Sequence, residues 1–360
     1  MKKAGILTYY NVHNHGSSLQ ALGLKNVLTS MGYDVSFLSF DRNYDFIPVE
    51  KKNKYKIGLS SIPFYFKYMF QMGISNILFN LSKKHKLDTF TENNLPSGGR
   101  YSDYHGDLVV IGSDEVFSFE IGINPFFYGI GLDAKKVISY AASFGPTISE
   151  DIQKNRLGYM LKSGFESLDA ISVRDNNSMR IVNEYSNKTP CLVCDPVILY
   201  GYKEEQLKYK PQNDEKYIIV YSYDKNFRDK KTIEQIKALA KKEKCRVYSV
   251  GYHHKWCDKN ICPDPIEMLG LFKNSKCVFT DTFHGAVVSL ITNTQFWVRL
   301  SGNQNKLRFL LSEYGLEGRI VDDFEDQNRL VNDVIDYNKV NTILENRRKA
   351  SLDFLKENVG

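Results

Sequence analysis

The stretch CVFTDTFHGAVVSLITNTQFWVRL, residues 277–300, decides the fold because it holds a strand, a helix and a second strand in order. Residues 277–280 and 296–300 are short runs of β-branched and aromatic side chains, which are typical of buried strands. Residues 285–292 form a longer apolar run that favours a helix. Alternating strands and helices are the pattern of a parallel sheet covered by helices, so this stretch predicts an α/β fold.

The same alternation extends through the rest of the chain. Further strands are expected at 5–10, 35–40, 108–112, 137–143, 170–174, 217–223 and 246–250, and further helices at 17–31, 229–242 and 266–273. The charged segment 200–215 carries a proline and predicts a domain boundary. We therefore expect Rossmann-like, doubly wound domains at 1–200 and 201–338 that face a cleft. A last helix within 339–360 is expected to cross back to the first domain.

Length and composition are those of a folded two-domain protein. The chain has 360 residues, of which 42% are apolar and 25% charged, which excludes disorder and collagen-like repeats. Its six cysteines all lie at or beyond position 191, too sparse for a disulfide framework, so a reducing compartment is expected. The sequence shows neither a signal peptide nor a membrane span. These features predict a cytoplasmic protein.

Charge is concentrated in one segment. The net charge of +6 is too small to argue for nucleic-acid binding. Residues 51–86, however, contain eight lysines and no acidic residue, interleaved with seven aromatic side chains. Such a segment suits peripheral contact with an anionic membrane. The alternative is a helical insertion, spanning about 51–90, that packs its aromatic side chains inward and keeps its lysines in solvent.

The first polar cluster, residues 11–20, joins a predicted strand to a predicted helix. It contains Asn14, His15, Gly16 and Ser17. Gly16 permits a tight turn, a serine can cap the helix, and the free N–H groups of a helix start favour an anion. Ordinary turn and capping chemistry explains this cluster equally well.

The second cluster, Ser113 and Asp114 with Glu115, follows the predicted strand 108–112. Carboxylates at a strand end can act as a base or accept hydrogen bonds from a sugar. Capping of the next helical turn by Ser113 or Asp114 is the favoured alternative.

Arg174 ends a third predicted strand and carries a planar guanidinium that suits a phosphate or a carboxylate. A structural pair with Asp175 or another carboxylate is equally well supported.

The fourth cluster, residues 280–285, contains Asp281, Thr282, His284 and Gly285. An imidazole at a helix start is disfavoured as imidazolium unless a bound anion compensates. With a phosphate-bearing substrate, His284 becomes a plausible proton donor.

Several other features carry weaker signals. Cys191 and Cys194 have C-x-x-C spacing, but the run 191–199 reads as a strand without a second cysteine pair, so no metal site is predicted. The histidines at 253–254 read as a surface loop. Arg299 and Arg308 follow the fourth cluster and could add positive charge to the same pocket, although solvated arginine is the plainer reading.

Taken in order, these motifs resemble those of the polysaccharide pyruvyl transferase family. The resemblance rests on GILTYYNVHNHGSSLQAL (5–22), VVIGSDEVF (109–117), ISYAASFG (138–145), ISVRDNNS (171–178), CDPVIL (194–199) and TDTFHGAVVSLITN (280–293). It spans nearly the whole chain and depends on the ordered set. It implies a GT-B-like pair of Rossmann-type domains and transfer of a pyruvyl group from phosphoenolpyruvate onto two sugar hydroxyls, forming a cyclic ketal.

The resemblance also assigns roles to residues. Many members carry an arginine two residues before the motif histidine, where this chain has Thr282, as in the branch with an Asp-Ser/Thr-Phe-His-Gly pattern. Arg174 is then the leading ligand for the donor's anions, with Arg299 or Arg308 behind it. His284 would protonate the donor, and Asp114 or Asp281 would be the base. Phosphoenolpyruvate is a co-substrate, and no metal or other cofactor is implied.

The expected acceptor is a sugar of an envelope polysaccharide precursor, carried on a lipid pyrophosphate at the inner face of the cytoplasmic membrane. Two alternatives stay open. A nucleotide-sugar glycosyltransferase of the same fold would need a carboxylate for ribose, for which Glu313 or Glu317 could be argued. A glycan- or lipid-binding accessory protein would need no catalytic His284.

Overall fold

A computed structural model describes residues 1–41, 73–209, 215–301 and 305–360. The first domain is built on a parallel sheet in the order β3-β2-β1-β4-β5, with strands β1 (Lys2–Leu7), β2 (Tyr33–Ser39), β3 (Ser97–Arg100), β4 (Leu108–Ile111) and β5 (Val137–Ser139). Short strands β6 (Ser172–Val173) and β7 (Cys191–Leu192) continue beside β5 through isolated bridges. This strand order is that of a Rossmann fold.

The second domain repeats the arrangement. Its parallel sheet has the order β10-β9-β8-β11-β12, with strands β8 (Tyr217–Tyr221), β9 (Arg246–Val250), β10 (Lys259–Ile261), β11 (Val278–Thr280) and β12 (Phe296–Val298). The predicted α/β fold with two Rossmann-like domains is therefore confirmed. Most strands are shorter than expected: β1, for example, ends at Leu7 and not at residue 10.

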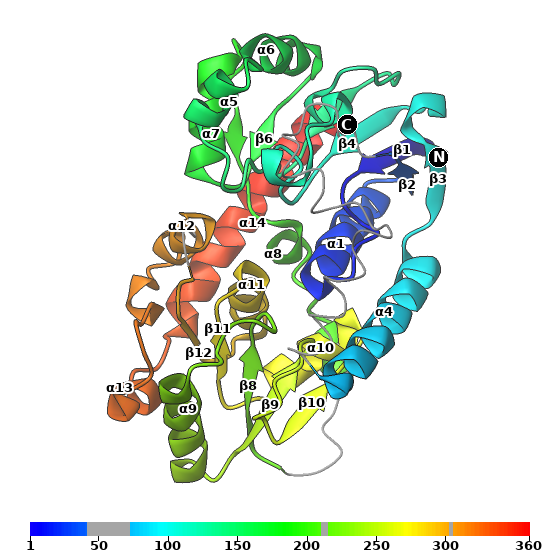
Figure 1. Cartoon of the computed structure of the whole chain (residues 1–360). Coiled ribbons are helices and arrows are strands. Elements are labelled where there is room, and N and C mark those ends of the chain that lie inside the picture. Colours follow the sequence, from blue (N-terminus) through cyan, green and yellow to red (C-terminus); the bar gives the residue numbers. More distant parts are fainter. Residues whose placement is uncertain (42–72, 210–214, 302–304) are drawn as a thin grey trace.

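Helices fill the junction between the two sheets (Figure 1). The helices of the first domain are α1 (His15–Ser30), α4 (Ile74–Asn94), α5 (Ser149–Lys154), α6 (Gly158–Ser167), α7 (Asn176–Tyr185) and α8 (Pro196–Tyr200). Those that follow are α9 (Lys230–Lys242), α10 (Pro265–Lys273), α11 (Phe283–Thr292), α12 (Asn305–Glu313), α13 (Gln327–Asn332) and α14 (Tyr337–Val359). The largest buried apolar cluster takes side chains from both domains. The two domains thus share one continuous core.

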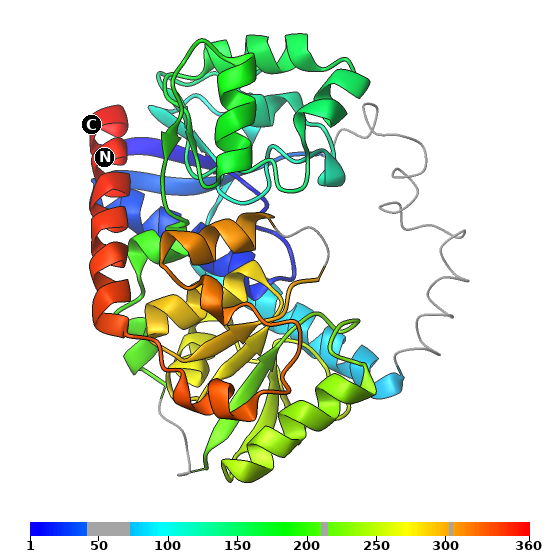
Figure 2. The ribbon, with the colours of Figure 1, turned by 90° about the vertical axis from the view of Figure 1, so that its left-hand side faces the viewer.

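The last helix, α14, runs along both domains (Figure 2). The Tyr337 hydroxyl donates to the Ser289 carbonyl in the second domain. Further along, Arg348 donates to the Ile198 carbonyl and Ser351 Oγ accepts from the Cys194 N–H in the first domain. The C-terminal helix therefore ties the first domain to the second.

The run 191–199 is not one strand, which corrects the sequence-based expectation. β7 ends at Leu192, and Asp195 caps α8 by accepting the Val197 N–H at 2.9 Å. Proline at the first helical position has no N–H to leave unpaired, so Asp195-Pro196 starts a helix. This change of direction takes Asp195 into the molecular interior.

The basic segment lies partly outside the described residues, since positions 51–72 belong to the undescribed range 42–72. Its last part forms the start of α4, which lies beside the second domain (Figure 1). Lys83 on this helix is buried, with Nζ 4.2 Å from the ring centroid of Tyr252. The expectation that all lysines of this segment lie in solvent is therefore wrong at Lys83. None of the described helices is both long and apolar enough to cross a membrane.

Candidate active site

A cavity of about 460 Å³ opens between the two domains. The first domain lines it with Asn14 and Ser17 at the start of α1 and with residues 114–115 after β4. The second lines it with Tyr221 and Tyr223 at the end of β8 and with residues 281–284 before and at the start of α11. The carboxyl ends of strands from both sheets thus meet at one place, which is where ligands bind in open α/β sheets.

His284 reaches this cavity from the first turn of α11. Thr282 is the N-cap of that helix, and its Oγ1 accepts the Gly285 N–H at 2.9 Å. A Cβ placed on Gly16 would lie 2.2 Å from His284 Cγ, so only glycine leaves room for the imidazole. His284 Nε2 lies 3.8 Å from Asp195 Oδ2 and has no hydrogen-bond partner in the described part of the chain.

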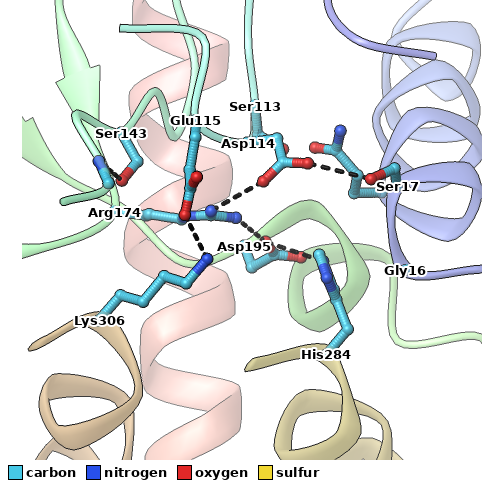
Figure 3. A network of polar contacts seen from close by, with 12 residues as sticks. Gly16, Ser17, Ser113, Asp114, Glu115, Ser143, Arg174, Asp195, His284 and Lys306 are labelled. Carbon is cyan, nitrogen blue, oxygen red and sulfur yellow. Dashed lines mark hydrogen bonds and ion pairs between the residues drawn. The ribbon is translucent and has the colours of Figure 1, made fainter. Parts of the chain in front are cut away.

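Arg174 joins two carboxylates behind the cavity (Figure 3). It donates to Asp195 at 2.8 Å and to Asp114 at 3.0 Å, and its side chain is only 1% exposed. Its guanidinium carbon lies 4.6 Å from the ring centroid of Phe283. Arg174 is not among the residues that line the cavity. Its partners are Asp114 and Asp195, whereas Asp175 caps α7.

Asp114 occupies a turn in which its φ angle is +73°, a left-handed conformation that aspartate tolerates better than most residues. Ser17 Oγ donates to one carboxylate oxygen of Asp114 at 3.0 Å, and Arg174 donates to the other. The start of α1 and the end of β4 are thereby joined through side chains.

The electrostatic environment drives the pKa values of the two lining aspartates in opposite directions. Burial would raise the pKa of Asp114, but Arg174, His284 and Lys306 outweigh it and hold that pKa well below its usual range. Burial raises the pKa of Asp281, and Asn226 only partly opposes the rise by donating to its carboxylate. Two carboxylates with diverging pKa values suit different roles in one reaction.

The pKa of His284 is lowered, because burial outweighs the attraction of Asp195 and Asp114. In the protein without ligand, the imidazole is therefore largely neutral at pH 7. Additional negative charge in the cavity would favour its protonated form.

One ion pair crosses the cavity between the domains. Lys306, in the first turn of α12, contacts Glu115, which follows Asp114 in the first domain (Figure 3). Among the cavity-lining residues that the structure describes, Lys306 is the one lysine, and no arginine lines the cavity.

Three residues of the predicted site take structural roles. His15 is buried, its Nε2 lies 3.0 Å from the Pro263 carbonyl, and burial lowers its pKa to about 3. Ser113 is buried and its carbonyl accepts the Thr8 hydroxyl at 2.9 Å. Gly285 is packed against Thr280 and leaves no room for a side chain. Of the first cluster, Asn14 and Ser17 line the cavity, and Asn14 caps α1 by accepting the Gly16 N–H at 2.8 Å.

The arginines proposed as supplementary anion ligands lie elsewhere. Arg299 pairs with Asp229 at 3.1 Å and stacks on Phe227, beside a separate cavity of about 320 Å³. Arg308 is exposed on α12 and does not line the interdomain cavity. Neither arginine lines the interdomain cavity, although the charge of Arg299 contributes to lowering the pKa of Asp281, against the effect of burial.

The carboxylates of the glycosyltransferase alternative are also distant from this cavity. Glu313 pairs with Arg347 at 2.5 Å, and Glu317 is exposed at the start of a 3₁₀ turn. Neither lines the interdomain cavity.

Cysteine and histidine pairs do not form a metal centre. Cys191 and Cys194 are free thiols, and the described residues contain no group of three or more His, Cys, Asp or Glu side chains suited to an ion. His254 is buried beside Ser249 and not on the surface as expected.

Asp195 and Lys306 are the residues that the sequence did not reveal. The Asp-Pro pair at 195–196 is a helix-start signal that could have identified Asp195 as buried at a cap. Nothing in the sequence marks Lys306, because its partner Glu115 lies 191 positions away.

Comparison with known proteins agrees with this architecture. The sequence model of the family described as polysaccharide pyruvyl transferase matches residues 14–300. No curated protein sequence matches the chain.

Among solved structures, the S. aureus MnaA–UDP complex is 12% identical with a TM-score of 0.54, covering 99% of this chain and 95% of that one. The UDP-GlcNAc 2-epimerase from Methanocaldococcus jannaschii is 13% identical with a TM-score of 0.52, covering 99% of both chains. At such low identity these similarities establish the fold alone. They support a GT-B-like arrangement of the two domains.

Proposed function

Since this chain belongs to the polysaccharide pyruvyl transferase family, we propose that it transfers a pyruvyl group from phosphoenolpyruvate onto two hydroxyls of a sugar, forming a cyclic ketal. One observation carries the proposal: an imidazole at a helix start faces an interdomain cavity and lies near two carboxylates, Asp195 and Asp114. A histidine in such a setting can gain a proton when an anionic donor binds and then release it.

The donor brings a phosphate and a carboxylate, which need positive partners. Lys306 offers an ammonium group at the cavity wall, and the start of α11 offers backbone N–H groups and the positive end of the helix dipole. Arg174 is already paired with Asp114 and Asp195. We therefore assign Lys306 as the donor ligand and Arg174 as a positioning residue for the two carboxylates.

The chemistry begins with protonation of donor carbon 3 by His284, which leaves positive charge on carbon 2. Asp114, held ionised by Arg174, stabilises that charge through space. The first sugar hydroxyl then attacks carbon 2 and gives its proton to Asp281, whose raised pKa makes it the stronger base. The carbon–oxygen bond to phosphate breaks, and the second hydroxyl closes the ring. The proton of the second hydroxyl leaves with the phosphate, and the proton held by Asp281 returns to His284 through solvent. One donor and one diol thus give one ketal and one phosphate, and the enzyme is restored.

We test this assignment with His284→Ala and a matched control, His105→Ala. His105 is exposed and pairs with Asp133 at 2.8 Å, far from the cavity-lining set. With phosphoenolpyruvate and a lipid-pyrophosphate-linked oligosaccharide, the wild-type protein and the control are expected to release phosphate and add the mass of the ketal. His284→Ala should slow both by about 100-fold or more. Near-normal turnover by a folded His284→Ala protein would remove His284 from the mechanism.

We also propose that the acceptor is carried on a lipid and met at an anionic membrane surface, so that the protein works at the inner face of the cytoplasmic membrane. The basic segment 51–86 supports this through its charge. On α4, three apolar side chains at helical spacing are exposed: Ile74 by 75%, Leu78 by 62% and Leu81 by 58%. Lysines next to an exposed apolar stripe are the composition of an interfacial helix.

A further inference from the structure

The wall of the cavity at the carboxyl ends of β8 and β9 is aromatic. Tyr221, Tyr223 and Tyr252 all line it, while the acid–base groups His284 and Asp281 line other parts of the same cavity. Ligand sites commonly combine an apolar, aromatic surface with a few polar groups that fix orientation. In the reaction proposed above, the charged residues of the cavity bind the donor or take part in the chemistry. The tyrosines have no role in it yet.

These tyrosines are held rigidly by one another. Tyr252 is 8% exposed and is packed edge-on against Tyr221, with ring centroids 5.2 Å apart and planes at 70°. Lys83 of α4 places its ammonium group 4.2 Å from the Tyr252 ring centroid. Tyr223 then packs on Tyr252 at 5.4 Å and 68°. Edge-to-face contacts at these distances are favourable. The contact with Tyr252 therefore restricts the orientation of the Tyr223 ring.

Tyr223 nevertheless stays 48% exposed, inside a cavity and on a fixed support. An aromatic ring that is fixed by its neighbours and open to a cavity offers a flat surface on which a ligand can pack. Burial raises the pKa of Tyr223 to about 12, and the carboxylates of Asp114, Glu115 and Asp281 add to the rise. Its hydroxyl is therefore a neutral hydrogen-bond donor close to the carboxylates of both domains.

We propose that Tyr223, supported by Tyr252, is the stacking platform of the acceptor site, and that it takes the apolar face of a pyranose ring. The inference rests on the proposed function and names the ligand class of the same cavity. A ring stacked on Tyr223 would present its hydroxyls at its edge, toward Asp281 and His284. Rigid aromatic side chains supply contact area at little entropic cost.

Charge favours a sugar over a nucleotide on this platform. The lining carboxylates Asp114, Glu115 and Asp281 outnumber the single lining lysine, Lys306. Lys306 is already assigned to the donor. A nucleoside diphosphate stacked on Tyr223 would therefore bring negative charge beside Asp281 without a lysine of its own, whereas a neutral pyranose would bring none. A nucleotide is therefore the competing outcome of the test.

The test uses direct binding by the 360-residue chain without donor. Saturation-transfer NMR would be recorded with a panel of methyl pyranosides (gluco, galacto, manno and N-acetylglucosamine) and, separately, with UDP. The variants are Tyr223→Leu, which removes the ring, and Tyr223→Phe, which keeps it. Because Tyr223 is half exposed, both should fold, and thermal unfolding would verify this. Phosphoenolpyruvate binding, measured by calorimetry, serves as the internal control.

We expect at least one pyranoside to bind the wild-type and Tyr223→Phe proteins, with affinity for Tyr223→Leu weaker by about tenfold or more. Donor affinity should stay within about twofold in all three proteins, and the acceptor KM should rise with Tyr223→Leu. The inference is overturned if no pyranoside in the panel binds, if binding is the same for Tyr223→Leu, or if UDP binds through Tyr223 and the pyranosides do not.

The outcomes also separate this inference from the proposed function. Pyranoside binding that depends on Tyr223, without donor-dependent ketal formation, would retain the subsite and reject the pyruvyl transfer. Ketal formation with an unchanged acceptor KM in Tyr223→Leu would retain the reaction and reject the subsite.

Discussion

Gly16 of the first domain lies against the imidazole of His284 in the second, so closely that a Cβ on Gly16 would be 2.2 Å from His284 Cγ. The orientation of the proposed acid is thus limited by a helix of the opposite domain. The first turn of α1 also contains Ser17, whose hydroxyl donates to Asp114. The same turn therefore positions groups on both sides of the cavity, and its glycine is a steric requirement of the site.

Gly16→Ala should displace His284 and lower turnover by about 100-fold, because the methyl group cannot share space with the ring. Alanine is otherwise well tolerated in a helix, so the free energy of unfolding should change much less than activity does. Gly318→Ala is the control, since a Cβ there meets nothing within 4 Å. Phosphate release and thermal unfolding measure the two effects. A fully active Gly16→Ala protein would show that His284 need not hold this position.

The pH dependence of turnover should reveal the depressed pKa of His284. Burial lowers that pKa in the ligand-free protein, and the acid must be protonated to act, so kcat/KM for the donor should fall as pH rises past a midpoint below 6.5. The bound donor's negative charges raise the pKa, so kcat should fall only at a higher pH. Phosphate release measured against pH at low donor gives the fall in kcat/KM, and at saturating donor it gives the fall in kcat. If both fall at the same pH, His284 is not the acid.

Arg174→Met should destabilise the fold, because it leaves Asp114 and Asp195 without their shared counterion. Removing one partner of a buried ion pair costs about 3 to 5 kcal/mol. The double variant Arg174→Met with Asp195→Asn should recover part of that loss, which chemical denaturation can measure. If Arg174→Met unfolds like the wild type while losing donor affinity, Arg174 is a donor ligand after all.

The sign of the accompanying pH effect follows from Asp114. Its folded-state pKa is lowered, so its ionisation stabilises the fold above the unfolded pKa of about 3.9 and the contribution is lost as pH falls. Without Arg174, the folded-state pKa of Asp114 should lie closer to its unfolded value. The acid side of the stability profile should then be flatter in Arg174→Met than in the wild type.

Lys306→Met should raise the KM for phosphoenolpyruvate with a smaller effect on thermal stability, since Lys306 is partly exposed and pairs with Glu115 across the cavity. Glu115→Gln should lower that KM, because it frees the ammonium group from its resting partner. Opposite changes in donor KM from the two variants are the expected result. Changes in the same direction would indicate that the pair acts as a structural link between the domains.

Most of the fold could be predicted from the sequence because its strands are local apolar runs with helices between them. β9 spans Arg246–Val250, as expected. Strand ends were less predictable. Residues 8–10 continue the apolar run but leave the sheet, and residues 140–143 keep only isolated bridges at Ala142 in place of a regular strand. The error at 191–199 has the same origin, because a buried helix and a buried strand present similar apolar runs over so few residues.

The candidate site was predictable where a single loop defines it. Asp114, Asp281 and His284 follow strands and all line the cavity. Lys306 could not be predicted, because its place depends on how the two domains pack. For Arg174 the sequence left open an anion ligand, the leading expectation, and a structural ion pair. The structure shows it paired with two carboxylates, Asp114 and Asp195.

Contact with a membrane is the most direct prediction from charge. Each lysine near an anionic surface contributes about 1 kcal/mol, so replacing Lys51, Lys52, Lys54 and Lys56 with glutamine should weaken binding to anionic vesicles strongly. Lys83 is excluded from this contribution, because it is buried against Tyr252. Replacing Leu78 and Leu81 with serine should also weaken binding, since both are exposed on α4.

The matched control replaces four exposed lysines of α9, namely Lys230, Lys237, Lys241 and Lys242, with glutamine. It removes the same charge from a helix without an exposed apolar stripe, so position and not net charge decides the result. Co-sedimentation with anionic vesicles should fall for the segment variant and little for the α9 variant, and added salt should weaken wild-type binding. With a lipid-linked acceptor, turnover should fall for the segment variant and little for the α9 variant. With a short soluble acceptor it should stay the same in both. The α9 lysines are not among the residues that line the cavity, and the substitutions at 51–56 leave every described cavity residue unchanged. Equal loss of vesicle binding in both variants would reduce the effect to overall charge and reject a dedicated membrane surface.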